Sequence, residues 1–291
     1  MSGTMTLVRR PAAVRRRVRE WRCRGLGIAF VPTMGAFHEG HLSLMRLARR
    51  KADRVVVSVF VNPTQFGPGE DFTAYPRDLR RDARLARGEG VDLCFAPSAE
   101  ALYGPNHRME VHPRILEDVL EGKTRPGHFA GVCLIVLKLL HIVEPDVLVL
   151  GQKDAQQAVI LETMVRDLDL PVRVVRGATV RDPDGLALSS RNAYLDPGQR
   201  AAAPVLYRGL RRAQERARKG ERSAARLLGG IRADLAREPR VRLDYAAAVD
   251  AVTLEPLRVL AGRVLFCLAA YLGKTRLIDN VQFTLRKRSS P

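Results

Sequence analysis

The sequence lacks the features of disulfide-linked and membrane-spanning proteins. It has only 4 Cys in 291 residues, without a C-x-x-C pair, and each lies in an apolar stretch, so we expect reduced, buried thiols and a cytoplasmic location. The longest apolar run, 129–143, is shorter than the roughly 20 residues that cross a bilayer. We therefore expect no membrane partner. The cysteines are Cys23, Cys94, Cys133 and Cys267.

Acidic residues are also scarce. There are 31 Asp and Glu against 49 Lys and Arg, which gives a net charge of +18, and nearly all of the cations are Arg. A nucleic-acid-binding protein concentrates its basic residues on one face, whereas here Arg is spread through every segment. The composition therefore indicates no nucleic-acid partner, although positive potential would attract small anionic ligands such as ATP or a carboxylate.

Short apolar runs rich in β-branched residues alternate with helical patterns in the first part of the chain. Such runs indicate a parallel sheet covered by helices on both faces. We expect a Rossmann-like α/β domain over 1–178 and a smaller, lid-like α+β domain over 179–291, with a disordered basic tail from about residue 285. The first helix is expected to bury Val14, Val18 and Trp21. The expected strands are 28–31, 55–61, 91–96, 146–151, 172–175, 243–249, 264–271 and 275–279.

One motif that could bind an anion follows the first of these strands. PTMGAFHEGH places His38 and His41 where a strand gives way to a helix, and ligands gather at such positions in open α/β sheets. Helix N-terminal amides favour an anion, Gly40 permits close backbone approach, and two imidazoles can donate hydrogen bonds to phosphate oxygens. A structural His pair or a metal site would show the same local pattern. Because no third ligand with zinc-like spacing is evident, we favour phosphate binding.

Two further motifs follow predicted strands, and each alone has a structural explanation. FVNPTQF carries Asn62 and Gln65 where the chain leaves the sheet, and it could be an ordinary Asn-Pro turn. GQKDAQQ opens a helix with Asp154 as a candidate cap, and it could be a solvated helix start. As a binding motif it would offer Lys153 to ATP phosphates, Asp154 to ribose hydroxyls and Gln157 to a small polar substrate.

The fourth motif is SSRN, in which the hydroxyl of Ser189 and the guanidinium of Arg191 could close over phosphates. The joint occurrence of the four motifs, in this order, is far more specific than any one of them. The sequence resembles the pantothenate synthetases, which belong to the adenylyl-transferring superfamily with HIGH-type motifs. The resemblance runs from the first helix to LIDN (277–280) and includes PTMGAxHEGH, FVNPxQF, AYPR, HFAGV, GxKDxQQ and SSRN.

This resemblance implies an ATP-dependent ligase that works in two steps. Pantoate and MgATP would give pantoyl-adenylate and pyrophosphate, and the amine of β-alanine would then attack the acyl carbon to give pantothenate and AMP. Such a reaction needs positioning and charge neutralisation more than a protein nucleophile. The resemblance also implies Mg²⁺ as cofactor and a homodimer, for which the strand 55–61 is a candidate interface.

The resemblance further implies a role for each matching residue. The residues implied in ATP binding are Met34, His38, His41, Gly151, Lys153, Asp154, Ser189 and Arg191. The catalytic residues among them are His38, His41, Lys153, Ser189 and Arg191. The residues implied for pantoate are Met34, Gln65 and Gln157, and those for β-alanine are Asn62 and Gln65. Weaker candidates for the site are Tyr75, Arg125 and His128. The metal site is unknown, with Asp82 as a candidate ligand.

Three positions depart from the family's usual pattern. Leu188 stands where Met is common, Ala155 where Tyr is common, and Gln152 where Glu is frequent. None of these removes a charged or hydrogen-bonding group assigned above, so we expect activity to be retained with altered nucleotide affinity. Two rival interpretations are another adenylyl- or cytidylyltransferase that shares the HxGH turn, and a basic nucleic-acid-binding protein. The paired glutamines 65 and 157 argue against the first.

Overall fold

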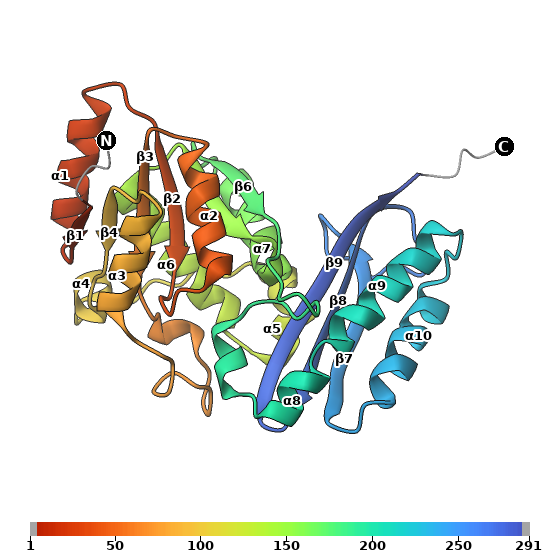
Figure 1. Ribbon diagram of the computed structural model, residues 1–291. Helices are drawn as coiled ribbons and strands as arrows, with labels where there is room; N and C mark the ends of the chain where they lie inside the picture. The colour runs from red at the N-terminus through yellow and green to blue at the C-terminus, as the bar shows by residue number, and fades with distance from the viewer. Residues whose placement is uncertain (1–4, 287–291) are drawn as a thin grey trace. The chain divides into compact units, whose positions relative to one another are not determined.

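The computed structural model describes residues 5–286, which divide into two compact units (Figure 1). The N-terminal unit comprises the described residues up to Gln152 together with Ile160–Ala178. The C-terminal unit comprises Lys153–Val159 together with the described residues from Thr179 onward. The chain therefore passes from one unit to the other inside the GQKDAQQ motif.

The N-terminal unit is built on a six-stranded parallel sheet with the strand order β1-β4-β3-β2-β5-β6. Since β2 lies between β3 and β5, the chain adds strands first on one side of β2 and later on the other. Open α/β sheets bind ligands at the carboxyl ends of the strands at such a reversal. The strands are β1 Thr6–Val8, β2 Ile28–Thr33, β3 Arg54–Val59, β4 Leu93–Phe95, β5 Val147–Gly151 and β6 Arg173–Gly177.

Helices bury both faces of this sheet. Alternate residues of the central strands, such as Val31 and Val57, share one core with Met45 of α2 and Ala86 of α3. The residues between them, such as Phe30, are equally buried, and on that face α6 contacts β2 and α1 contacts α6. The helices and 3₁₀ turns of this part of the chain are α1 Pro11–Arg22, α2 Glu39–Arg49, η1 Pro63–Gln65, α3 Leu79–Gly88, α4 Ala99–Tyr103, η2 Arg114–Glu117, α5 Glu121–Thr124, α6 His128–Val143, η3 Gln152–Asp154 and α7 Ala155–Asp167.

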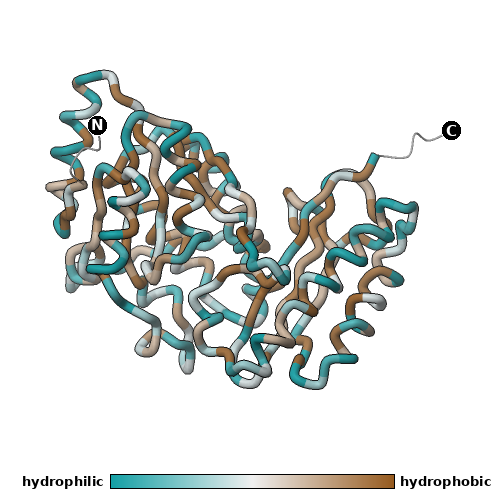
Figure 2. Tube along the Cα trace, in the orientation of Figure 1, coloured by the Kyte–Doolittle hydropathy of each residue, from teal (hydrophilic) through white to brown (hydrophobic). Residues whose placement is uncertain are grey.

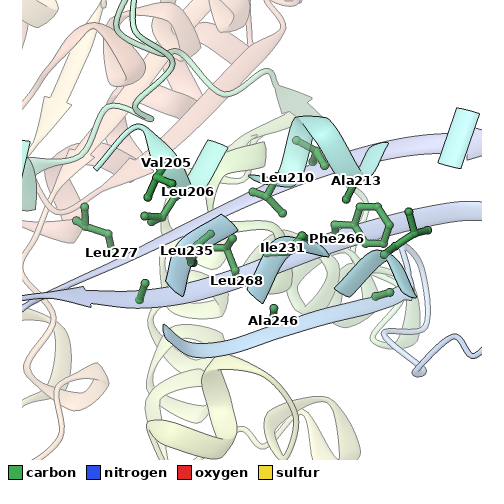
Figure 3. Packing of buried hydrophobic residues seen from close by; sticks show 14 of the residues in the cluster. Val205, Leu206, Leu210, Ala213, Ile231, Leu235, Ala246, Phe266, Leu268 and Leu277 are labelled. Carbon is green, nitrogen blue, oxygen red and sulfur yellow. The ribbon is translucent and has the colours of Figure 1, made fainter. Parts of the chain in front are cut away.

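The C-terminal unit contains a three-stranded antiparallel sheet in the order β7-β8-β9, against which α9 and α10 pack (Figure 1). Both helices alternate hydrophobic and hydrophilic residues along their length (Figure 2). Their apolar sides supply Leu206, Leu210, Ile231 and Leu235 to a core shared with Phe266 of β8 (Figure 3). The elements are η4 Ser190–Tyr194, α8 Pro197–Ala202, α9 Val205–Arg218, α10 Ala224–Ala236, β7 Val241–Asp250, β8 Gly262–Leu272 and β9 Thr275–Leu285.

The predicted fold class is confirmed, with local differences. The short edge strand β1 was not predicted, because three residues give too little pattern to recognise. β9 continues to Leu285 rather than ending at 279, and its last residues alternate buried and exposed side chains as a half-buried strand does. Residues 287–291 of the basic tail lie outside the described residues, so its predicted disorder stays a prediction.

One expectation about burial is wrong. Cys94, Cys133 and Cys267 are buried, but Cys23 is exposed, because it caps the end of α1 outside the buried stripe that the sequence predicts correctly for that helix. The strand at 54–59 is a central strand, and residues 55–58 are buried within the chain. The role of 55–61 in a dimer stays a prediction. No helix within 5–286 is long and apolar enough to cross a membrane.

Candidate active site

Two of the four motifs, and the start of a third, meet where the sheet reverses its strand order. β2 ends at Thr33 and leads into PTMGAFHEGH, while its neighbour β3 ends at Val59 and leads into FVNPTQF. On the other side of β2, β5 ends at Gly151, the first residue of GQKDAQQ. Because the strands are parallel, these carboxyl ends share one edge of the sheet, which is the edge that binds ligands in folds of this kind.

A buried carboxylate shapes the turn between β2 and α2. Asp82, which is 1% exposed, accepts hydrogen bonds from the backbone N–H groups of Ala36 at 2.9 Å and Phe37 at 2.8 Å. Gly35 has a φ of 86°, and a Cβ there would lie 2.8 Å from an Asp82 oxygen and 2.9 Å from Val59. Both backbone angle and space therefore require glycine at position 35.

Burial raises the pKa of Asp82, and its bonds to the amides of Phe37 and Ala36 oppose that rise. Each oxygen of the Asp82 carboxylate already accepts a backbone N–H, so Asp82 stabilises the turn. This geometry does not support Asp82 as a ligand of Mg²⁺. Moreover, no group of three or more His, Cys, Asp or Glu side chains in the described part of the chain is placed to hold a metal ion.

His38 and His41 cap the N-terminus of α2. His38 Nδ1 accepts from the Gly40 N–H at 3.1 Å, and His41 Nδ1 accepts from the His38 N–H at 3.4 Å, which forms a reciprocal capping box. A Cβ at Gly40 would lie 2.8 Å from the His38 ring, so glycine lets that ring fold over the helix end. The helix begins at Glu39, and the centroids of the His38 and His41 rings are 4.2 Å apart.

This capping arrangement sets the tautomer of both rings. A neutral imidazole whose Nδ1 accepts a hydrogen bond carries its proton on Nε2. In a neutral ring of His38 or His41 the proton is therefore on Nε2. Both rings lie at the N-terminus of α2, whose partial positive charge favours an anion.

Asn62 and Gln65 are buried side chains that hold each other. They are 1% and 8% exposed. Asn62 Nδ2 donates to Gln65 Oε1 at 3.2 Å and to the Gly131 carbonyl at 3.1 Å, and Asn62 Oδ1 accepts from the Tyr103 hydroxyl at 2.5 Å. Gln65 Nε2 lies 3.0 Å from Met34 Sδ. The ends of β2 and β3 thus bring Met34 and Gln65 together, with Asn62 and Tyr103 as support.

A second set of residues fixes the main chain of Gln65. His128 Nδ1 donates to the Gln65 carbonyl oxygen at 2.7 Å, and His128 Nε2 accepts from Arg125 Nη1 at 3.0 Å. The Arg125 guanidinium in turn donates to both carboxylate oxygens of Glu70, at 2.6 and 2.7 Å. Burial, and then the charge of Arg125, lowers the pKa of His128 to about 4, so this ring is neutral near pH 7. Arg125 and His128 therefore act through the backbone of Gln65.

Lys153 belongs to the C-terminal unit, where β9 holds its peptide. Asn280 Nδ2 donates to the Lys153 carbonyl oxygen at 2.8 Å, and the Lys153 ammonium lies 3.3 Å from Asp154 Oδ1. Beside Asn280, Asp279 is 4% exposed and pairs with Arg181 through two hydrogen bonds of 2.7 and 2.8 Å. Sequence reasoning missed Arg181 and Asn280 as supports, although the family resemblance extends to LIDN.

SSRN forms η4 in the same unit, and η4 packs against β9. Ser189 caps η4 by accepting the Arg191 N–H at 3.3 Å, and Asn192 Nδ2 donates to the Ala187 carbonyl at 3.0 Å. Gln157 is partly buried in the first turn of α7 and also belongs to the C-terminal unit. The residues gathered in this unit are Lys153, Asp154, Gln157, Ser189 and Arg191. Those gathered in the N-terminal unit are Met34, His38, His41, Asn62, Gln65 and Gly151.

Comparison with known proteins identifies the family of this chain. The profile of the family described as pantoate-beta-alanine ligase matches residues 6–282. A pantothenate synthetase from Moorella thermoacetica is 52% identical over 277 residues, which cover 95% of this chain and 98% of that protein. The crystal structure of the pantothenate synthetase from Thermus thermophilus is 46% identical and superposes with a TM-score of 0.89, over 95% of this chain and 99% of that one.

One solved relative was crystallised with ligands. The pantoate-beta-alanine ligase from Francisella tularensis, complexed with beta-gamma ATP and beta-alanine, is 34% identical to this chain. The two superpose with a TM-score of 0.78 over 96% of this chain and 97% of that one.

Proposed function

Since this chain belongs to the pantoate-beta-alanine ligase family, we propose that it forms pantothenate through a pantoyl-adenylate. A pantoate carboxylate oxygen attacks the α-phosphorus of ATP, and the bond from that phosphorus to the bridging oxygen of pyrophosphate breaks. The amine of β-alanine then attacks the acyl carbon, AMP leaves, and the amine loses a proton. Both steps depend on positioning and charge stabilisation rather than on a protein nucleophile.

The observation that carries this proposal is the capping geometry of His38 and His41. The two rings cap a helix N-terminus at the carboxyl edge of the sheet, and such a position favours the negative charge of ATP phosphates. We assign both residues to phosphate binding and to stabilising the transition state. Lys153, Ser189 and Arg191 complete the phosphate contacts, while Gly151 and Asp154 hold the ribose.

The pair Met34 and Gln65 is assigned to pantoate. Met34 offers apolar surface to the dimethyl group and Gln65 offers an amide to hydroxyl and carboxylate oxygens, together with Gln157. Asn62 is assigned to the β-alanine side; because both of its N–H donors bond within the protein, its main contribution is to orient Gln65. Mg²⁺ enters bound to ATP and keeps several waters, which fits the absence of a three-carboxylate or His cluster among the described residues.

The homodimer remains a proposal drawn from the family resemblance. Light scattering coupled to gel filtration measures the mass of the assembly directly. A mass near twice 32.3 kDa supports the dimer, and a mass near that of one chain contradicts it.

The activity is tested by incubating the purified protein with ATP, Mg²⁺, pantoate and β-alanine and measuring AMP and pantothenate, with each substrate omitted in turn. Equal amounts of both products that require both organic substrates support the proposal. Replacing His41 with Ala should reduce kcat by the equivalent of roughly 2 to 4 kcal/mol, the size of a lost transition-state donor. Unchanged turnover in that variant would remove His41 from the mechanism, while absent product with salt-sensitive DNA binding would favour the nucleic-acid alternative.

A further inference from the structure

The LIDN segment of β9 carries two buried polar side chains that the proposed reaction does not use. Asp279 and Asn280 are 4% and 5% exposed. Burying a carboxylate and an amide in a small sheet is unfavourable unless their hydrogen bonds are made inside the protein. One of these contacts reaches the peptide of Lys153.

Asn280 makes the decisive contact. Its Nδ2 donates to the Lys153 carbonyl oxygen at 2.8 Å, across 127 positions of sequence. Its backbone N–H donates to Asp279 Oδ1 at 2.7 Å, which fixes the local conformation of the strand. Asp279 in turn holds Arg181, whose guanidinium lies 3.6 Å from the ring centroid of Tyr207. The main chain of Asn280 is therefore held by an ion pair whose guanidinium packs on an aromatic ring.

The position of the Lys153 ammonium depends on how firmly its backbone is fixed. A Lys ammonium sits on a flexible four-carbon stem, so its reach depends on where its backbone is fixed. The strand that fixes it also packs against η4, which contains Arg191 and is capped by Ser189. The same strand thus supports all three residues that we assign to ATP phosphates in this unit.

We propose that Asn280 is a positioning residue for adenylate formation: it fixes the main chain of Lys153 so that the ammonium reaches the phosphates in one geometry. The inference rests on the proposed function of Lys153. Asp279 and Arg181 hold the main chain of Asn280 and have no direct part in binding ATP.

The test measures pantoate-dependent exchange of pyrophosphate into ATP, which reports the first step alone. Replacing Asn280 with Ala should lower this rate roughly 10- to 100-fold, because small misplacements of a charge-stabilising group cost that much. The KM for pantoate should stay close to its starting value. Asn280→Asp, which keeps the volume but removes both N–H donors, should lower the rate in the same way, and thermal unfolding of both variants establishes that they are folded.

A double-mutant cycle separates positioning from general damage. In a Lys153→Ala background, Asn280→Ala should change the exchange rate by less than about 3-fold, because its route to the substrate is already gone. If the two losses multiply instead, Asn280 does not act through Lys153 and the inference is overturned. If Lys153→Ala alone retains full exchange activity, the proposed role of Lys153 is wrong, and that outcome is distinct from failure of the Asn280 inference.

A second pair of variants supplies a matched control. Asp279→Asn removes the charge that holds Arg181, and Asp244→Asn removes the charge that pairs with Arg276 at 2.8 Å in the same sheet. We expect the first to lower the exchange rate and the second to leave it unchanged. Equal losses would show that any disturbed ion pair in this sheet has the same effect, which contradicts a specific route from Asn280 to Lys153.

Discussion

Replacing Gly131 with Ala tests the close contact between α6 and the backbone of Thr64 and Gln65. Gly131 lies in α6, and a Cβ added there would overlap the Thr64 carbonyl group, 2.6 Å from its carbon, and would lie 2.8 Å from the Gln65 backbone nitrogen. These are backbone atoms, so no side chain can rotate away. The Gly131 carbonyl also accepts a hydrogen bond from Asn62. The substitution must therefore move η1 away from α6.

Two effects of opposite sign determine the size of the change. Alanine favours a helix interior over glycine by about 1 kcal/mol, whereas forcing a methyl group into filled space costs about 1 to 3 kcal/mol. The Thr64 carbonyl carbon must retreat from 2.6 Å to the 3.4 Å at which ordinary contact begins, and a misplacement of about 1 Å near a reacting group can cost about 100-fold in rate. We expect a net loss of up to about 2 kcal/mol in stability and a raised KM for pantoate.

Urea unfolding followed by circular dichroism, together with steady-state kinetics, measures both effects. Gly229→Ala is the matched control, because Gly229 also lies in a helix but has no atom within 4 Å of an added Cβ. That variant should gain about 0.5 to 1 kcal/mol and keep wild-type kinetics. If Gly131→Ala is stabilised like Gly229→Ala and binds pantoate normally, the close contact between α6 and η1 does not control the site.

Three other predictions follow from buried groups. Asp82→Asn places an amide N–H against one of the two backbone N–H groups that the carboxylate accepts. It should lower the free energy of unfolding by about 1 to 3 kcal/mol, measured by thermal unfolding, and lower the pyrophosphate-exchange rate. Full activity would show that the turn between β2 and α2 keeps its conformation without Asp82. Because burial and Arg125 lower the pKa of His128 to about 4, the unfolded chain binds a proton that the folded chain excludes, so stability should fall as pH drops from about 6.5 to 4, by up to about 3 kcal/mol. In urea unfolding measured across this pH range, His128→Gln should remove most of the loss of stability at low pH. His112→Gln, at an exposed histidine, should show the same loss as the wild type. If His128→Gln shows it too, His128 is not its cause. Burial raises the pKa of Cys94 to about 11 and of Cys133 to about 12, so a thiol-reactive disulfide reagent should label one thiol per native chain quickly, and Cys23→Ser should abolish that reaction.

Sequence reasoning succeeded where the information is local. The strands of the parallel sheet are mostly apolar runs, and three of the motifs could be placed at their carboxyl ends because each follows its strand directly. SSRN follows no strand of that sheet and lies in the C-terminal unit. The cap formed by His38 is also local, but it was not predicted.

Contacts between distant segments have no comparable signal in a single sequence. Asp82 bonds to the turn 46 and 45 positions earlier, and Arg181 meets Asp279 over 98 positions. Asp and Arg at these positions look like ordinary surface residues in the sequence, and only the fold reveals that both aspartates are buried. Cys23 is a different case, because it lies outside the correctly predicted buried stripe of α1, at the end of the helix.

The bond between Asn280 and Lys153 also constrains the order of events during synthesis. The two residues are 127 positions apart, so at about 5 to 20 residues per second the ribosome needs roughly 6 to 25 seconds to deliver the amide after the lysine has emerged. The sheet of the N-terminal unit can form during that interval, but residues 153–159 must wait for β9, the last strand made. A nascent chain stalled before residue 280 would therefore hold the N-terminal sheet folded while the Lys153 carbonyl still lacks its partner from β9.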